Sequence, residues 1–241
     1  VESLDAVSPV YKRAFQGMYA LLSALSDAGK ITKSSDITEE LWGFYVGPMF
    51  NAVKRLDGDM SRAYGAFLGT HSPAEYVTYL FEMNEQRKAV VSEQYNLMMT
   101  GNQPLAPYAY IVDTYPGVCG LLASKVMNET GIPTMVLNKG SEGAYHGSAR
   151  SPEWYPIRSR AAWLPGMRFA GHECACGVNA VSYDVLAQGI AWLHSDCLQV
   201  QQTLEVGEAP FDILISTYGD GDTDIDIDLL SEFLHELHRY G

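Results

Sequence analysis

The sequence lacks several features that would assign it to a common class at once. No apolar run is long enough to span a bilayer, so we expect no membrane contact. The first five residues do not form a signal peptide, and since they lack an initiator Met we expect a fragment or a processed product. No second Cys or His pair accompanies the single C-x-C, which disfavours zinc and favours reduced thiols in the cytoplasm. The four cysteines are Cys119, Cys174, Cys176 and Cys197.

Basic residues are also scarce. The chain has 16 Lys and Arg against 29 Asp and Glu, and this net charge of −13 argues at first against nucleic acid as a partner. Thirteen of the acids lie in residues 173–241, where Arg239 is the only base. Between Lys139 and His172, by contrast, five bases accompany two acids. An acidic segment elsewhere does not prevent anion binding at this locally basic stretch.

Two Gly-containing pieces lie in or beside this basic stretch. They are Gly147-Ser148-Ala149-Arg150-Ser151 and Ala170-Gly171-His172, the latter followed by Ala175 and Gly177. Glycine lets backbone approach a ligand, Arg matches phosphate oxygens, and His is a donor that titrates near neutral pH. We interpret the stretch as a surface for a phosphate-bearing ligand. The alternative is a Gly-rich hairpin with satisfied polar side chains.

The N-terminal part of the chain is predicted to be helical. Apolar periodicity predicts helices over 5–28 and 59–68, while 41–46 fits either a strand or a helix end. Ser72-Pro73-Ala74-Glu75 is a capping box that opens a helix to about Thr100, with Gly101 at its C′ position. This long helix either links two lobes or forms part of one core.

The pattern changes after residue 107. A strand at 108–113, a helix at 118–130 ended by Gly131 and a strand at 133–138 form a β-α-β unit, which favours parallel strands. Further strands are predicted at 145–151, 174–180 and 211–217, and helices at 182–204 and 226–240. We therefore predict an α/β protein with an N-terminal helical segment, a long linking helix and a C-terminal α/β lobe. Its sheet is expected to be mixed and mainly parallel.

A series of motifs resembles the RecJ group of the DHH phosphoesterase superfamily. Pro48–Leu56 resembles that group's P-R-x-N-A-x-x-R-L segment, and Asn84–Lys88 its N-x-x-R-K. Four further motifs follow in the family's order: Gly117-Val118 with Gly120 and Ala123, then G-x-P, GSARS and G-H-x-x-A-x-G. The resemblance covers residues 40–204. Three positions depart from it: Met49 replaces an Arg and removes one expected phosphate or base contact, Ala170 replaces a Gly, and Cys176 replaces an Ala.

The resemblance implies a metal-dependent, single-strand-specific exonuclease that hydrolyses phosphodiesters from the 5′ end. It implies that residues 1–71 are the helical remainder of the DHH lobe, 72–104 the linking helix and 105–241 the DHH-associated nucleic-acid-binding domain. The family's metal ligands precede the matched region, and the chain has no D-H-H triplet. We expect no metal to be bound by this chain, and Mn²⁺ or Mg²⁺ in the metal lobe. The run Asp222, Asp224, Asp226, Asp228 is either a hard-cation site or a solvated acidic loop.

The same resemblance and the side-chain chemistry assign roles to individual residues. His172 is the expected catalytic residue, reaching the scissile phosphate from the side opposite the metals. The expected substrate-binding residues are Ser148, Arg150, Ser151, Gly171, Asn51 and Arg55. Tyr145, Trp154 and Tyr155 either stack on unpaired bases or pack in the core.

These assignments predict the substrate-binding portion of a single-stranded-DNA-specific 5′ to 3′ exonuclease, inactive alone. The expected partners are single-stranded nucleic acid and other DNA-repair or replication proteins, in the cytoplasm. Two alternatives remain open. One is a catalytically inactive nucleic-acid-binding or scaffold homologue, and the other is a phosphodiesterase for short oligonucleotides or cyclic dinucleotides.

Overall fold

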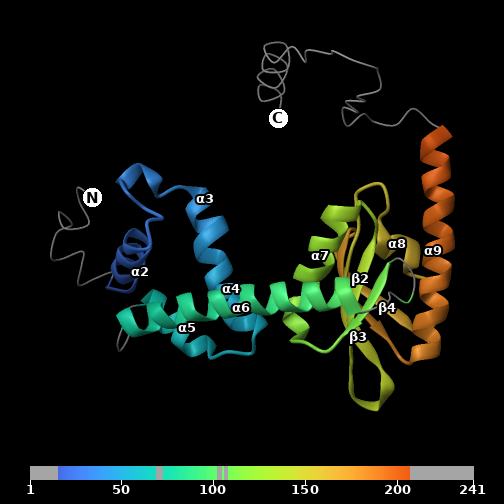
Figure 1. The fold of residues 1–241 in the computed structure, drawn as a ribbon, viewed down its shortest axis with the longest axis horizontal. Helices are drawn as coiled ribbons and strands as arrows, with labels where there is room; N and C mark the ends of the chain where they lie inside the picture. The colour runs from blue at the N-terminus through green and yellow to red at the C-terminus, as the bar shows by residue number, and fades with distance from the viewer. Residues whose placement is uncertain (1–15, 69–72, 102–104, 106–107, 207–241) are drawn as a thin grey trace, which may run out of the picture. The chain divides into compact units, whose positions relative to one another are not determined.

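The computed structural model describes residues 16–68, 73–101, 105 and 108–206 (Figure 1). The expected cap at Ser72, the strand at 211–217, the helix at 226–240 and the acidic run at 222–228 lie outside these residues. Within the described ranges, no helix is long and apolar enough to cross a membrane.

The first part of the chain is helical. Its elements are α2 (Gln16–Asp27), η1 (Ser34–Asp36), α3 (Glu39–Leu41), the π-helical η2 (Trp42–Val46), α4 (Gly47–Arg55), α5 (Met60–Leu68) and α6 (Pro73–Gly101). Helices α2, α4 and α5 pack against α6. The segment 41–46, predicted as a strand or a helix end, is helical, and Gly101 is the last residue of α6 rather than its C′ residue.

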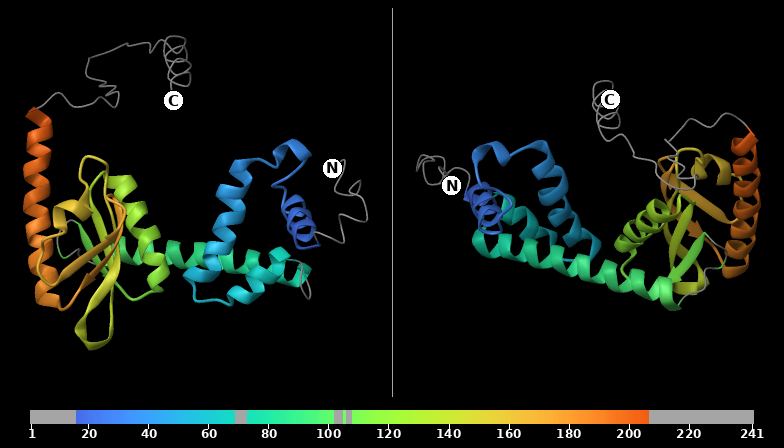
Figure 2. Two further views of the ribbon diagram at one scale, coloured as in Figure 1. Left: turned by 180° about the vertical axis from the view of Figure 1, so that it is seen from behind. Right: turned by 45° about the horizontal axis from the view of Figure 1, so that its top comes forward.

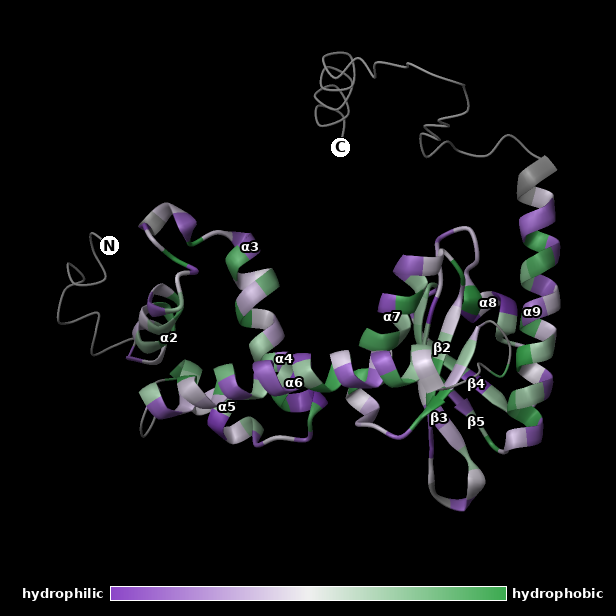
Figure 3. Ribbon diagram, viewed as in Figure 1, coloured by the Kyte–Doolittle hydropathy of each residue, from purple (hydrophilic) through white to green (hydrophobic). Residues whose placement is uncertain are grey.

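Helix α6 carries polar and apolar bands along its whole length (Figure 3). Its buried residues are Val77, Leu80, Met83 and Met98, and none of residues 84–97 is buried. A core helix would bury one continuous stripe. The burial pattern therefore favours a linking helix, and the division into 1–71, 72–104 and 105–241 stays a prediction.

Residues 108–206 form a five-stranded sheet with three α-helices. Strand β1 (Ala109–Val112) is followed by η3 (Pro116–Val118) and α7 (Cys119–Thr130), and then by β2 (Thr134–Lys139), η4 (Ser141–Gly143) and β3 (Tyr145–Arg150). Helix α8 (Ile157–Ala161), β4 (Met167–Gly171), β5 (Ala175–Ala180) and α9 (Tyr183–Val206) complete it. The strand order is β1-β2-β3-β5-β4. Gly131 ends α7 in the left-handed conformation that glycine favours, with φ 67°.

The sheet is mixed, as predicted, but the expectation that it is mainly parallel is wrong. Only β1 and β2 run parallel, and the β2–β3, β3–β5 and β4–β5 pairs are antiparallel. The physical reason is the length of the connections, because a parallel crossover needs about a dozen residues or more. The turn from Lys139 to Tyr145 is shorter, and it is closed by a hydrogen bond from the Gly140 N–H to the Ala144 carbonyl at 2.8 Å.

The two faces of the sheet have different covers (Figure 2). Side chains alternate between faces along each strand. One face, here called the α7 face, packs Val112 and Val136 against Leu122 and Val126 of α7. The other, the α9 face, packs Leu137 and Val178 against α8 and α9. Both helix layers lie where the sheet is apolar, which leaves the β4–β5 end of the α7 face as the place for polar chemistry.

Candidate nucleic-acid interface

Three rows of residues cross β3, β5 and β4 on the α7 face. The β3–β5 register places Arg150 beside Ala175, Ser148 beside Gly177 and His146 beside Asn179. The β5–β4 register then places Gly177 beside Ala170 and Asn179 beside Arg168. The His172 N–H donates to the Ala175 carbonyl at 3.0 Å, so His172 extends the first row. We call these the Arg150 row (Arg150, Ala175, His172), the middle row (Ser148, Gly177, Ala170) and the Arg168 row (His146, Asn179, Arg168).

The middle row forms a shallow floor. A Cβ atom on Gly177 would meet nothing nearer than the Ala170 and Gly147 carbonyl oxygens, at 3.7 and 3.8 Å. Ala170 is exposed, as are Arg168, His172 and Asn179 in the outer rows. Polar and cationic side chains therefore border a floor that has almost no side chain of its own.

Arg150 lies against the first turn of α7. A Cβ on Gly120 would stand 2.7 Å from Arg150 Nη2 and 3.4 Å from Ser148 Oγ, so glycine at this position leaves room for both side chains. Arg150 Nη1 donates to the Ala149 carbonyl at 2.7 Å. Burial lowers the pKa of Arg150. The guanidinium is partly buried, yet no carboxylate among the described residues forms an ion pair with it.

The charges of two further arginines act on Arg55. Burial, followed by the charges of Arg87 and Arg150, lowers the pKa of Arg55. Arg55 is the last residue of α4, Arg87 lies in the middle of α6 and Arg150 ends β3, so α6 and β3 each contribute one cation that acts on Arg55. We call Arg55, Arg87 and Arg150 the arginine cluster.

The arginine cluster has little compensation from acids. Burial lowers the pKa of Arg87, and Glu85 is the acid that acts on it, but the Glu85 carboxylate already pairs with Lys88 at 2.6 Å. Arg87 Nε and, one turn earlier, Asn84 Oδ1 are buried without a hydrogen-bond partner among the described residues. Buried donors and uncompensated cations are costly unless a ligand satisfies them. The cluster has the properties of an anion site.

The remaining predicted residues of α4 differ in their surroundings. Asn51 is exposed one turn before Arg55, on the same side of the helix. Met49 is only 2% exposed and packs in the core of the helical part. Met49 therefore contributes to the core, and the positive charge that an Arg would carry at this position is missing.

Gly171 and His172 lie at the turn between β4 and β5. Gly171 has φ +135°, and a Cβ there would stand 3.0 Å from the Ala175 carbonyl oxygen, so the turn requires glycine. The turn is anchored by hydrogen bonds from Ser151 N–H to the Cys174 carbonyl at 2.9 Å and from Arg158 N–H to the Glu173 carbonyl at 3.1 Å. Hydrogen bonds from Ser159 and Arg158 hold the pKa of Glu173 below its ordinary value. His172 is thus an exposed side chain on a fixed turn.

Not every predicted residue reaches this surface. Ser151 is 4% exposed, and its Oγ is buried without a partner among the described residues, so its role as a phosphate ligand stays a prediction. Tyr145 and Tyr155 are 7% and 0% exposed and belong to the core of the α9 face, which removes them as stacking platforms. The Tyr155 hydroxyl donates to Asp196 Oδ2 at 2.8 Å. Trp154 is partly buried and packs edge-on against Tyr155.

Sequence reasoning missed Arg87 as a site residue, although it noted the Asn84–Lys88 motif. The signal was the i, i+3 spacing of Asn84 and Arg87, which places both on one side of α6. The spacing does not show that this side of α6 lies near Arg55 of α4, which only the packing of the helices reveals.

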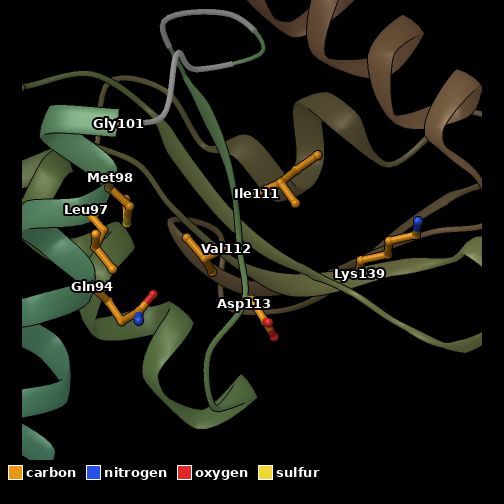
Figure 4. A pocket seen from close by; sticks show the side chains of 8 residues that line it. All are labelled: Gln94, Leu97, Met98, Gly101, Ile111, Val112, Asp113 and Lys139. Carbon is orange, nitrogen blue, oxygen red and sulfur yellow. The ribbon is translucent and has the colours of Figure 1, made fainter.

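The described residues contain no group of three or more His, Cys, Asp or Glu side chains that would hold a metal ion. A separate groove of about 700 Å³ lies between the end of α6 and the β1 edge of the sheet (Figure 4). Its polar side chains are Gln94, Asp113 and Lys139, and none of the predicted site residues lines it.

Comparisons with known proteins agree with the motifs. No protein-family model matches the chain. The single-stranded-DNA-specific exonuclease RecJ of Haemophilus influenzae is 28% identical over 207 residues, which cover 76% of this chain and 35% of the relative. The protein of the same name from Bacillus subtilis is 28% identical over 160 residues, and that from Escherichia coli 27% over 180 residues. These matches cover 62% and 68% of this chain, and 20% and 30% of the relatives.

A solved structure is similar in fold. RecJ from Thermus thermophilus in complex with Mn²⁺ superposes with a TM-score of 0.56 at 21% identity, over 79% of this chain and 28% of that one. Its Mg²⁺ complex gives a TM-score of 0.55. The chain spans about a third or less of the length of these relatives.

The helical part, the long helix α6 and the mixed sheet share the fold of the RecJ structure from Thermus thermophilus. In sequence, the chain is similar to the RecJ exonucleases at 27–28% identity.

Proposed function

We propose that this chain supplies the substrate-binding surface of a single-stranded-DNA-specific 5′ to 3′ exonuclease. The observation that carries this proposal is the arginine cluster, in which Arg55, Arg87 and Arg150 gather without an equal number of carboxylates. A protein folded for stability alone would not bring three partly buried cations together, because each repels the others and loses hydration.

The charge of the cluster matches a terminal phosphate best. A phosphate monoester carries between one and two negative charges near pH 7, because its second pKa is about 6, whereas an internal phosphodiester carries one. The planar guanidinium groups of arginine bind such oxygens through charge-assisted hydrogen bonds. Ser148 Oγ, beside Arg150, and the exposed Asn51 amide add neutral donors. The cluster is thus assigned to the 5′-terminal phosphate.

His172 is assigned to the next phosphate along the strand. It lies in the same row as Arg150 but directly after the end of β4, two strand spacings or about 10 Å away. An imidazole N–H at that position would donate to the phosphate oxygens as negative charge develops during cleavage. Gly171 fixes the turn that presents it. The terminal phosphate would therefore set which ester His172 contacts.

The implied metals do not fit the described residues, which offer no set of three acidic, His or Cys ligands. No step of this proposal passes through a metal held by this chain. The proposed contribution is limited to binding, orientation and the donation of hydrogen bonds.

Binding of 5′-phosphorylated and 5′-hydroxyl oligo(dT) to the 241-residue chain tests the assignment. Arg55→Gln, Arg87→Gln and Arg150→Gln should each remove the preference for the 5′-phosphate, by roughly tenfold or more for a charge-assisted contact. Lys54→Gln is the matched control, because Lys54 adjoins Arg55 but is exposed. A cyclic dinucleotide, which has no terminal phosphate, should bind more weakly than the 5′-phosphorylated strand.

Unfolding of the same variants separates this function from a structural role. Removing one of three uncompensated cations should leave the free energy of unfolding unchanged or raise it, while affinity falls. Loss of stability together with loss of affinity, or equal binding of 5′-phosphate and 5′-hydroxyl strands, would contradict the proposal.

A further inference from the structure

The Arg168 row is a second cluster of polar side chains on the same face, and the assignments above do not use it. His146 on β3 is paired with Asn179 on β5, which is paired with Arg168 on the edge strand β4. Paired residues of neighbouring strands lie on the same face of a sheet, so the three side chains are neighbours. Two of them are able to carry positive charge, and the third has an amide donor.

The row is open to a ligand. Arg168 and Asn179 are exposed, and Arg168 forms no ion pair with the other described residues. His146 is held in place: a Cβ on Gly140 would stand 2.7 Å from its Cε1 atom and 2.8 Å from its Nδ1 atom. The glycine at the end of β2 therefore provides the space that the imidazole ring occupies.

The surface between the two cationic rows is clear. The middle row presents a hydroxyl, a hydrogen and a methyl group, from Ser148, Gly177 and Ala170. Nothing within 3.7 Å would meet a side chain at Gly177. A polymer that contacts the Arg150 row is therefore able to reach the Arg168 row along the strands without crossing a large side chain.

The spacing of the rows matches a nucleic-acid backbone. Four residues separate His172 from Arg168 and Arg150 from His146, which is about 14 Å along a strand. Each two-residue step, about 7 Å, is comparable to the distance between successive phosphates of an extended single strand. The Arg168 row is thus two nucleotide steps from the Arg150 row.

From this geometry we infer that the Arg168 row is a phosphate subsite for a single strand, two nucleotides downstream of the phosphate at His172. The inference rests on the proposed function and adds a length requirement to it. With the terminal phosphate in the arginine cluster and the second at His172, the Arg168 row takes the fourth phosphate. Strands shorter than four nucleotides do not reach it.

The test compares 5′-phosphorylated dT2 and dT6 by fluorescence anisotropy, using the 241-residue chain and its variants. Arg168→Gln should lower affinity for dT6 by about threefold to fivefold, as expected for one exposed charge contact. It should leave dT2 unchanged. The salt dependence for dT6 should fall by about 0.7 in the slope of log K against log salt, the contribution of one phosphate on a single strand. Asn179→Asp should weaken dT6 binding in the same length-dependent way.

Lys125→Gln is the control, since it removes one exposed charge from α7 without touching the rows. Equal effects of Arg168→Gln on dT2 and dT6, or no effect on either, would overturn the subsite. In that case Arg168 is a charge that protects the edge strand β4 from pairing with other chains. Arg150→Gln should weaken both oligonucleotides. If the wild-type chain binds neither of them, the proposed function fails, and the subsite with it.

Discussion

Gly117 lies against the backbone of Arg55 so closely that a Cβ atom on the glycine would stand 2.6 Å from the Arg55 Cα. It would also stand 2.7 Å from the Arg55 carbonyl oxygen. The nearest atoms all belong to the Arg55 backbone, so no flexible side chain is able to move aside. The contact between η3 and the end of α4 thus fixes the position of the Arg55 backbone, from which the guanidinium side chain extends.

Gly117→Ala should therefore separate η3 from α4. We expect a loss of about 1–3 kcal/mol in the free energy of unfolding, the usual cost of overpacking. The preference for 5′-phosphorylated strands should fall as well, because Arg55 shifts away from Arg150. Gly43→Ala is the control, since a Cβ at Gly43 meets nothing within 4 Å. Urea denaturation and oligonucleotide binding measure the two effects, and normal values of both in Gly117→Ala would contradict the packing argument.

The same substitution at two glycines of the sheet should have opposite results. A Cβ on Gly147 would stand 2.0 Å from the Val136 carbonyl oxygen, so Gly147→Ala should break the β2–β3 pairing and prevent stable folding. A Cβ on Gly177 would make only ordinary van der Waals contact, with carbonyl oxygens at 3.7 and 3.8 Å, so Gly177→Ala should leave the melting temperature nearly unchanged. It adds a methyl group to the middle row, however, and should weaken strand binding. Thermal melts of both variants, followed by oligonucleotide titration of Gly177→Ala, make the comparison.

Asp196 joins α8 to α9 through a hydrogen-bonded pair. Arg160 Nε and Nη2 donate to its two oxygens at 2.5 and 2.6 Å, and Tyr155 adds a third bond. Asp196→Asn leaves the Tyr155 hydroxyl and the guanidinium poorly paired and should cost about 1–3 kcal/mol. Urea denaturation at pH 7 measures the loss, and an unchanged midpoint would show that the pair contributes nothing to stability.

The pH dependence of the same pair has a definite sign. Hydrogen bonds from Arg160 hold the pKa of Asp196 below its ordinary value in the folded protein. A depressed folded pKa means that the ionised form stabilises the fold above the unfolded pKa of about 3.9. This stabilisation is lost as the pH falls through the lower folded pKa. The stability difference between wild type and Asp196→Asn should thus be constant from pH 5 to 7 and shrink below about pH 4.

Under the proposed function, His172→Ala in an exonuclease that contains this chain should lower turnover far more than strand affinity. A donor matched to developing charge acts mainly in the transition state, and losing one costs on the order of a hundredfold in rate. Single-turnover cleavage of a short 5′-phosphorylated strand measures the rate, and thermal unfolding of the same sample checks the fold. A normal rate in a well-folded variant would return the Gly171 turn to a structural role.

The 241-residue chain should show no Mn²⁺-dependent cleavage of single-stranded DNA, because its described residues offer no cluster of metal ligands. The measurement is incubation with labelled oligonucleotide at increasing Mn²⁺, with EDTA as the control. Reproducible, EDTA-sensitive cleavage that persists through purification would contradict it and would direct attention to Asp222–Asp228.

Local signals explain which elements could be predicted. Gly131 ends α7 where a left-handed residue is needed, and the apolar runs on either side predict β1 and β2. Strand β4 was not predicted, because Arg168 and Ala170 look like part of a Gly-rich loop in the sequence. Both side chains are exposed because β4 is an edge strand with one uncovered face. The short α8 escaped for a similar reason: its Ile157 and Ala161 give only one turn of periodicity.

The site required information that is not local. Ser148 and Arg150 were predicted from the family resemblance of their motif and from their side-chain chemistry, and the register places them on the α7 face. Ser151 looks equivalent in sequence, but one further residue along a strand changes the face, and it is buried. Arg87 becomes a candidate only because the packing of α4 places its charge within reach of Arg55. No pattern within α6 contains that relationship.

Helix α6 also limits how the chain is able to change in length. Arg87 belongs to the arginine cluster, and eight residues later Tyr95 contacts α7 through Glu129 and Lys125. Inserting or deleting one residue between them would turn one contact relative to the other by about 100° and shift it by about 1.5 Å. Such a change would rotate Arg87 out of the cluster while leaving every side chain intact. In related chains, substitutions should therefore accumulate along residues 88–94, while gaps there should be absent.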